Sequence, residues 1–300
     1  MRIFVTGASG MVGTALCPEL ARHGHEVVRT DLRPSDEATE PLDVRNGEEI
    51  RTVLGAVRPA LVMHLAAETD VDRCEQEPAH AYLTNAVATE YVASACRALR
   101  LRLLYMSTAG VFDGTKPSPY VESDLPNPAN VYGRAKLAGE IAVRRCVPNH
   151  LIVRAGWMVG GVELDKKFAG KILRLLETRK ELSVVTDKIG TPTFTGDLAR
   201  GIAALIETGE TGLFHMANHG GCSRYEFACK LVEYAGRGDV TVRPITSEAF
   251  PLPAPRADSE SLENARLQAL GLDRMPTWQE ALQRYVHHYL ATVKSCASSF

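Results

Sequence analysis

The stretch RIFVTGASGMVG, residues 2–13, decides the fold of this 300-residue chain. The mostly apolar residues 2–6 predict a buried strand, and glycines 7, 10 and 13 follow it at the start of a predicted helix. Small residues at such a turn let backbone N–H groups approach a pyrophosphate, and the helix N-terminus adds partial positive charge. A glycine trio alone is a weak signal, but its place between a strand and a helix predicts a dinucleotide-binding turn. The candidate contacts are Gly7, Ser9, Gly10, Met11, Val12 and Gly13.

Apolar runs alternate with helix-like segments through the first half of the chain. The predicted strands cover residues 2–6, 26–30, 60–66, 102–107 and 151–155, and the predicted helices cover residues 11–23, 47–57, 80–99 and 131–146. This alternation indicates a parallel sheet with helices on both faces, and strands that are apolar almost throughout fit a sheet covered on both sides. The sequence therefore predicts an α/β protein with a Rossmann-like, doubly wound parallel sheet.

The second half of the chain is less regular. A strand at 182–186 and a helix at 196–207 could extend the sheet, and the proline-rich residues 250–259 predict a loop. Ser223 with Glu226, and Thr277 with Glu280, have the spacing of capping boxes at helix starts. We expect residues 1–154 to form the dinucleotide-binding domain, with 187–216 returning to it. Residues 155–186 and 217–300 would form a smaller C-terminal substrate-binding lobe.

Composition and charge narrow the classes of partner. The net charge of -2 and the pI near 6.5 argue against a nucleic-acid partner and against a polybasic membrane surface. No apolar run approaches the roughly 18 residues of a membrane span. A strand and a turn occupy residues 1–10, where a cleaved signal peptide would lie. Seven scattered cysteines without metal-ligand spacing indicate reduced thiols, so we expect a cytoplasmic protein that requires no divalent metal.

Acidic residues indicate which dinucleotide binds. Asp31 closes the second predicted strand, 18 residues beyond Gly13. A carboxylate there would bind the adenosine ribose hydroxyls and repel a 2′-phosphate, which favours NAD(H). Arg33 could instead grip that phosphate, which leaves NADP(H) open. Asp43 stands where a carboxylate could reach the adenine amine, with a solvated loop acid as the alternative.

A third motif combines a tyrosine and a lysine. In VYGRAKLAGE, residues 131–140, Tyr132 and Lys136 are four residues apart on a predicted helix and share one face. The ordinary tyrosine pKa near 10 is too high for ready proton transfer at pH 7, and a neighbouring ammonium would lower it. Thr108, at the end of the strand before STAGVFDG (107–114), is the natural third member. Such a spacing often occurs on an ordinary helix surface, but its position downstream of a dinucleotide turn favours catalysis.

Four stretches together resemble the extended short-chain dehydrogenase/reductases. They are TGASGMVG (6–13), HLAAETDVDRCE (64–75), STAGVFDG (107–114) and NPANVYGRAKLAGE (127–140). Within this family the chain is most similar to the dTDP-4-dehydrorhamnose reductase group. LSVVTDKIGTPTFTGDLAR (182–200) matches a signature of that group, and the similarity continues through PLPAPRADSESLEN (251–264).

The resemblance implies a set of site residues. Thr108, Tyr132 and Lys136 would be catalytic. The cofactor would contact the glycine turn, Asp31 and a further set: Asp43, Val44, Leu65, Ala66, Ala67, Tyr132 and Lys136. The substrate would contact Thr69, Val71, Thr108, Trp157 and Arg256. From the residues alone, a tryptophan such as Trp157 is more often a core residue than a ligand contact, and Arg256 could be either a phosphate clamp or a solvated side chain.

The reaction implied by the resemblance is NAD(P)H-dependent reduction of the 4-keto group of a nucleotide-linked 6-deoxyhexose, as in dTDP-4-dehydrorhamnose to dTDP-L-rhamnose. Three departures from the group put the sugar in question: Ala109 and Gly110 replace an Asp-Tyr pair on the substrate side, and Ala257 replaces a proline. Another nucleotide-sugar reductase or an epimerase therefore stays open, whereas a dehydratase should carry an acidic pair at 109 and 110.

Two alternatives are not enzymes. One is a dinucleotide-binding regulatory subunit similar to that of methionine adenosyltransferase, and the other is a dinucleotide-sensing repressor. The set Thr108, Tyr132 and Lys136 disfavours both. The resemblance also leaves open a homodimer through the helices near 80–99 and 131–146.

Overall fold

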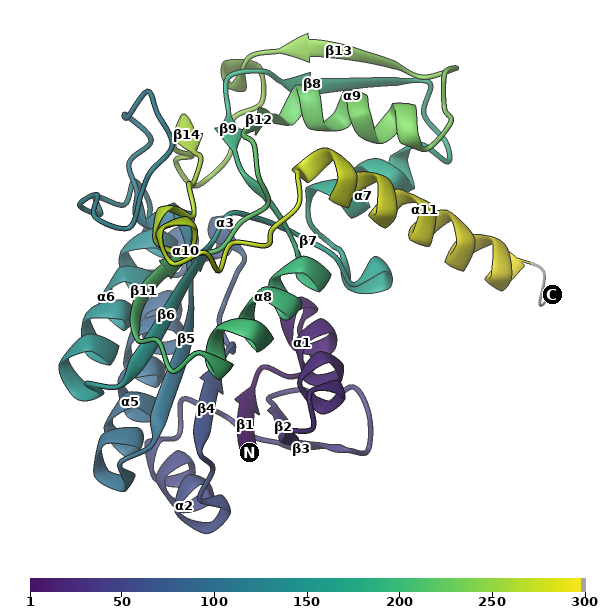
Figure 1. Ribbon diagram of the computed structural model, residues 1–300. Helices are drawn as coiled ribbons and strands as arrows, with labels where there is room; N and C mark the ends of the chain where they lie inside the picture. Colours follow the sequence, from purple (N-terminus) through teal and green to yellow (C-terminus); the bar gives the residue numbers. More distant parts are fainter. Residues whose placement is uncertain (298–300) are drawn as a thin grey trace.

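The computed structural model describes residues 1–297 and is built around a seven-stranded parallel sheet (Figure 1). Its order is β11-β6-β5-β4-β1-β2-β3. The strands are β1 (Arg2–Thr6), β2 (Glu26–Asp31), β3 (Thr39–Pro41), β4 (Leu61–His64), β5 (Arg102–Thr108), β6 (His150–Ala155) and β11 (Gly212–His215). The predicted α/β fold class, with a Rossmann-like doubly wound sheet, is confirmed.

The order of the strands locates the site. From β1 the chain adds β2 and β3 on one side, and β4, β5, β6 and β11 on the other. Ligands of such sheets bind at the carboxyl ends of the strands, where the direction of winding reverses. In this chain that point lies between β1 and β4, so the glycine turn after β1 and the segments that follow β4 and β5 share one edge.

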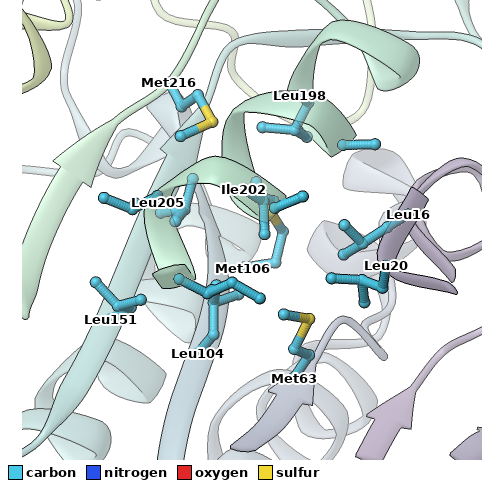
Figure 2. Close-up of a cluster of buried hydrophobic side chains, with 14 of the residues drawn as sticks. Leu16, Leu20, Met63, Leu104, Met106, Leu151, Leu198, Ile202, Leu205 and Met216 are labelled. Carbon is cyan, nitrogen blue, oxygen red and sulfur yellow. The ribbon is translucent and has the colours of Figure 1, made fainter. Parts of the chain in front are cut away.

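Helices cover both faces because successive side chains of each strand point in opposite directions. Ile3 and Val5 pack under α1 (Met11–Arg22) and α8 (Thr195–Glu207), in the core that Figure 2 shows with Leu16, Leu20, Leu198 and Ile202. Phe4, between them in sequence, joins the opposite core. That core is covered by α2 (Gly47–Val57), α5 (Ala88–Leu99) and α6 (Val131–Cys146).

The predicted helix at 80–99 is divided in the structure. It comprises α4 (Pro78–Tyr82), a π-helical turn (Leu83–Val87) and α5, preceded by the short helix α3 (Val71–Gln76). Asn85, buried in the π-helical turn, bonds outside the helix: its side chain accepts from the Glu68 N–H and donates to the Glu68 carbonyl, at 2.9 Å each. The π-helical turn thereby anchors the segment that follows β4 at the edge carrying the site.

A second group of elements forms its own core around Trp157, Phe227 and Trp278. Three small sheets contribute: β7 (Trp157–Val159) with β10 (Pro192–Phe194), β8 (Glu181–Val185) with β13 (Thr241–Ile245), and β9 (Ile189–Gly190) between β12 (Cys222–Ser223) and β14 (Ser259–Glu260). Three helices pack with them: α7 (Phe168–Leu175), α9 (Arg224–Tyr234) and α11 (Trp278–Ala297). Single 3₁₀ turns occur at Ala109–Val111, Val162–Leu164 and Ser247–Ala249.

One expectation for the second half is wrong. The strand predicted at 182–186 does not extend the central sheet, because it forms β8 and pairs with β13; β11 extends the sheet instead. The predicted helix at 196–207 does return, since α8 packs beside α1 on the sheet. The Ser223 and Thr277 capping interactions both form, with the N–H of Glu226 donating to Ser223 at 3.0 Å and that of Glu280 to Thr277 at 3.4 Å.

We propose that residues 1–154 and 187–216 form the dinucleotide-binding unit and that residues 155–186 with 217–297 form the smaller lobe. Within the first unit, β9 and β10 pair with strands of the second group. Leu267, on α10 (Ala265–Ala269), and Met275 pack into the first core, so we assign this short return to the first unit. Within residues 1–297 no helix is long and apolar enough to cross a membrane.

Candidate active site

The turn after β1 has the geometry of a dinucleotide cradle. Gly7 has φ +73°, and a Cβ there would lie 2.6 Å from the Ala66 nitrogen. At Gly13 a Cβ would lie 2.4 Å from the Ala8 carbonyl oxygen. Gly10 precedes α1 and makes no side-chain cap, so no side chain occupies the positive end of that helix. The backbone can therefore approach a diphosphate closely, and the residues fit the group that the sequence predicts.

Asp31 lies beside this turn with its carboxylate fixed. One oxygen accepts the Ser9 N–H at 3.0 Å and the other accepts the Arg33 N–H at 2.9 Å. Two backbone donors hold the side chain in place and leave further lone pairs on both oxygens. The arrangement fits a carboxylate that accepts ribose hydroxyls. The structure therefore brings Asp31, Ser9 and the glycine turn together.

The remaining predicted cofactor contacts lie along the same edge. One of them, the Asp43 carboxylate, already has a side-chain partner. Leu65 follows β4 and donates its N–H to the Thr6 carbonyl at 3.1 Å, and Ala66 and Ala67 continue past the glycine turn. Val44 is buried in the core. The Asp43 carboxylate is already paired with Arg45 at 2.6 Å, and a side-chain hydrogen bond from Arg45 lowers its pKa.

Thr108 and Tyr132 meet at the carboxyl end of β5. Thr108 ends that strand, and its hydroxyl accepts the Gly110 N–H at 3.1 Å. Asn130 caps α6 by accepting the Gly133 N–H at 2.9 Å, which places Tyr132 in the first turn of the helix. Burial raises the pKa of Tyr132 to about 12, and the adjacent Thr108 side chain acts in the opposite direction. The expected lowering of the Tyr132 pKa by Lys136 is therefore wrong for the chain alone, and Tyr132 keeps its proton at neutral pH.

Lys136 lies one turn along α6 and is buried. Its Nζ donates to the Met106 carbonyl at 2.7 Å and stands 4.1 Å from the centre of the Tyr105 ring. Burial lowers its pKa to about 7, and the Glu140 carboxylate opposes this change. A lysine with this pKa changes charge near neutral pH, which suits a group that takes part in proton transfer.

Behind Lys136 lies a buried ion pair that was not predicted from the sequence. Arg154 donates from Nε and Nη2 to the two oxygens of Glu140, at 2.7 Å each, and the Ser107 hydroxyl donates to the same carboxylate at 2.6 Å. Two signals pointed to it: Glu140 is four residues beyond Lys136, and Arg154 interrupts an apolar strand. Ser107 thus supports this network, while its neighbour Thr108 lies beside Tyr132.

Of the predicted substrate residues, Thr108 lies beside Tyr132, and three of the other four have hydrogen-bond or ion-pair partners elsewhere in the structure. Thr69 accepts from the Lys167 Nζ at its carbonyl, 2.8 Å, and at its hydroxyl, 3.1 Å. Val71 begins α3. Arg256 forms an ion pair with Asp72 at 2.9 Å, so its guanidinium has a carboxylate partner instead of being solvated. Trp157 is buried, and its Nε1 donates to Glu260 at 2.8 Å. Glu260 was not predicted, and nothing in the sequence pattern distinguished it.

Among residues 1–297 no group of three or more His, Cys, Asp or Glu side chains could hold a metal ion. The site combines the dinucleotide cradle, the partly buried Thr108 and Tyr132, and the buried Lys136. Together these can bind a cofactor beside a proton donor.

Comparison with known proteins agrees with this arrangement. The RmlD substrate binding domain family matches residues 1–291. The dTDP-4-dehydrorhamnose reductase of Mycolicibacterium smegmatis is 36% identical over 284 residues, which cover 94% of this chain and 84% of that protein. A dTDP-4-dehydrorhamnose reductase structure from Clostridium acetobutylicum matches with TM-score 0.90 and 35% identity, over 96% of this chain and 99% of that one.

A second solved structure adds a cofactor to the comparison. The dTDP-4-dehydrorhamnose reductase of Bacillus anthracis, in complex with NADP, matches with TM-score 0.89 and 36% identity, over 96% of this chain and 99% of that one. The resemblance seen in the sequence is confirmed. Because the family match spans residues 1–291 and the similarity to these relatives covers nearly the whole chain, the chain belongs to the RmlD substrate binding domain family.

Proposed function

We propose that this chain is an NAD(P)H-dependent oxidoreductase that reduces the 4-keto group of a nucleotide-linked 6-deoxyhexose, converting dTDP-4-dehydrorhamnose to dTDP-L-rhamnose. One observation carries the proposal. A protonated Tyr132 lies beside Thr108 and one turn from Lys136, at the same sheet edge as the glycine turn. The relatives named for this reaction support the choice of substrate.

The chemistry follows from the state of these side chains. Bound NADH or NADPH supplies the hydride that reduces the carbonyl carbon. Tyr132 donates its proton to the carbonyl oxygen as negative charge develops there, and the Thr108 hydroxyl donates a hydrogen bond to the same oxygen. Lys136 holds the nicotinamide ribose and, while protonated, stabilises the phenolate that Tyr132 leaves behind.

The dinucleotide preference rests on Asp31. Its carboxylate is held by the N–H groups of Ser9 and Arg33, so it cannot turn away from a 2′-phosphate without losing both bonds. We therefore propose NADH as the preferred reductant. Arg33 is exposed and can contact a 2′-phosphate, and a relative is solved with NADP. We therefore expect NADPH to be used as well, with a lower kcat/KM than NADH because Asp31 repels the 2′-phosphate.

A homodimer through the turn at Leu83–Val87, α5 and α6 is part of the proposal. Leu83, Tyr91 and Ile141 are exposed apolar side chains on these neighbouring elements. Sedimentation should show a dimer for the chain and a monomer for Ile141→Lys, whereas Leu125→Lys, at an exposed loop position, should stay dimeric.

The buried free thiols of Cys17, Cys74 and Cys96 agree with a reducing compartment such as the cytoplasm.

The proposed function is tested by following NADH and NADPH oxidation at 340 nm with dTDP-4-keto-6-deoxyhexoses. We expect turnover that depends on the keto sugar, is faster with NADH, and yields dTDP-L-rhamnose identified by NMR. The 4-hydroxy sugar should give no oxidation. Absence of turnover with every keto sugar and both reductants would overturn the proposal.

A further inference from the structure

A carboxylate from the far end of the chain lies beside the proposed proton donor. Glu260 belongs to β14, at the end of the proline-rich loop, and pairs in register with Gly190 of β9. Its Oε1 lies 3.5 Å from the point that a Cβ on Gly110 would occupy, and Thr108 Oγ1 lies 3.4 Å from the same point. Glu260 therefore reaches the space left free by the absence of a side chain at residue 110.

Trp157 fixes the orientation of this carboxylate. Its Nε1 donates to Glu260 Oε2 at 2.8 Å. The indole contacts both Arg224, whose guanidinium lies 3.5 Å from the ring centre, and Gly190. A Cβ on Gly190 would come within 2.2 Å of the ring, so glycine is required there. These contacts position the indole whose Nε1 donates to Glu260 Oε2.

The other oxygen remains available to a ligand. Within residues 1–297 no hydrogen-bond donor is found for Glu260 Oε1, and the residue is only partly buried. The negative charge of Glu260 acts on both Tyr132 and Arg224, which confirms that it lies close to each of them. A carboxylate accepts hydrogen bonds and donates none, so its ligand must carry a donor.

We infer that Glu260 is a specificity-determining residue, positioned by Trp157, that accepts a hydrogen bond from the hydroxyl next to the keto group of the sugar. The inference rests on the proposed function. If Thr108 and Tyr132 hold the 4-keto oxygen, Glu260 Oε1 faces a carbon bonded to the carbonyl carbon. In a 4-keto-6-deoxyhexose, carbon 5 carries only the methyl group and the ring oxygen, so the donor is the hydroxyl on carbon 3.

This assignment also accounts for Gly110. The missing side chain at that position leaves room for a carboxylate supplied by β14. Because the contact joins a charged acceptor to a hydroxyl, its loss should reduce kcat/KM by roughly 10- to 100-fold. The contact does not involve the dinucleotide, so cofactor affinity should not change.

The test combines an enzyme variant with a substrate variant. Steady-state kcat/KM is measured for the wild type and Glu260→Gln, each with the 4-keto-6-deoxy sugar nucleotide and with its 3-deoxy analogue. Removal of the 3-hydroxyl should cost the wild type roughly 10- to 100-fold and should cost Glu260→Gln about twofold or less. Glu263→Gln, an exposed acidic position three residues on, serves as the matched control and should behave like the wild type.

Two further measurements separate recognition from structure. NADH affinity and the melting temperature should be the same for Glu260→Gln, Glu263→Gln and the wild type. Trp157→Phe, which removes the donor that holds Oε2, should weaken discrimination between the two sugars in the same direction as Glu260→Gln. Equal discrimination by active wild type and active Glu260→Gln would overturn this inference alone. A wild type without turnover on any keto sugar would overturn the proposed function as well.

Discussion

The state of a single hydroxyl sets the chemistry that the site can perform. Burial raises the pKa of Tyr132 to about 12, so the hydroxyl keeps its proton at neutral pH and gives it up only as negative charge develops on the substrate oxygen. Removal of that oxygen in Tyr132→Phe should lower kcat roughly 10²- to 10⁴-fold, the usual contribution of a positioned proton donor. The dissociation constant for NADH, measured by fluorescence, should change by about twofold or less.

The matched control for this prediction is Tyr91→Phe. Tyr91 is exposed on α5, and the same chemical change there should leave both kcat and NADH affinity unaltered. If Tyr132→Phe instead weakened NADH binding as much as it slowed turnover, the hydroxyl would have a structural role in the cofactor site.

We expect Lys136 to be needed for activity, whereas burial of its ammonium group lowers the stability of the folded chain. Its pKa falls from the ordinary 10.5 to about 7 in the folded chain. Between pH 7 and 10.5 the unfolded chain therefore binds more protons at Lys136 than the folded chain does. Burial of the ammonium destabilises the folded chain fully below pH 7, and this destabilisation decreases as the pH rises above 7. Lys136→Met should therefore lose activity, but its free energy of unfolding at pH 6 should exceed that of the wild type by a few kcal/mol. Each unit by which the lysine pKa is lowered corresponds to at most about 1.4 kcal/mol.

Urea unfolding of the two proteins at pH 6, 7.5 and 9 checks this. The advantage of Lys136→Met over the wild type should shrink as the pH rises above 7. Taking the difference removes the titration of other groups, such as the buried thiols. An advantage that stayed constant with pH would show that Lys136 is charged throughout in the folded state.

At the scale of the elements, the β1–α1 turn depends on close backbone contact. A Cβ on Gly13 would lie 2.4 Å from the Ala8 carbonyl oxygen, whereas at Gly55 on α2 no atom lies within 4 Å of the Cβ position. Both glycines are inside helices. Gly13→Ala should therefore lower the free energy of unfolding by roughly 1–3 kcal/mol, while Gly55→Ala should raise it by about 0.5–1 kcal/mol.

Denaturant unfolding and NADH titration of both variants measure these effects. Gly13→Ala should also bind NADH more weakly, because the turn must move away from the diphosphate. Gly55→Ala should bind it like the wild type. A Gly13→Ala protein of unchanged stability and affinity would mean that the turn is adaptable and is not the cradle described above.

The elements differ in how far the sequence could predict them. The predicted strands 2–6, 26–30, 102–107 and 151–155 match β1, β2, β5 and β6 to within one residue at each end. Three of them, β1, β5 and β6, are mostly buried, as apolar strands of a parallel sheet are, whereas β2 is only partly buried. The strands β9, β12 and β14 have two residues each and carry no periodicity. They form only because distant segments meet, so Glu260 could not be placed beside Gly110 from local sequence.

The same limit applies to the candidate site. Thr108, Tyr132 and Lys136 could be found because their spacing follows the period of a helix and the end of a strand. The partners of Asp43 and Arg256 could not be found, since Arg45 and Asp72 are ordinary surface residue types that become partners only in the folded chain. The direction in which the Tyr132 pKa shifts depends on burial, which the spacing of residues does not reveal.

For the molecule as a whole, two buried histidines in the central sheet make the free energy of unfolding depend on pH in acid. His64 on β4 lies between the hydroxyls of Thr6 and Thr89, and His215 on β11 contacts the Tyr120 and Glu263 carbonyls. Burial lowers the pKa of each to about 3. Both therefore stay neutral in the folded chain at pH values where an unfolded histidine, with a pKa near 6.5, takes up a proton.

The sign of the effect follows from that proton count. Between pH 6.5 and 3 the unfolded chain binds more protons at these two positions, so stability is full above pH 6.5 and falls as the pH is lowered. Two such groups give a slope that approaches about 2.7 kcal/mol per pH unit. His23, whose pKa is raised by its hydrogen bond to Glu207, acts in the opposite direction at the surface.

Urea unfolding at pH 7, 6 and 5 measures the slope above the range in which carboxylates dominate. NMR provides the direct control, since the ring resonances of His64 and His215 should not titrate above pH 4. A ring at position 64 that titrated near 6.5 would contradict the prediction. Because β4 and β11 lie near the middle and at one edge of the sheet, a confirmed slope would show that acid acts on the whole sheet and not on the smaller lobe alone.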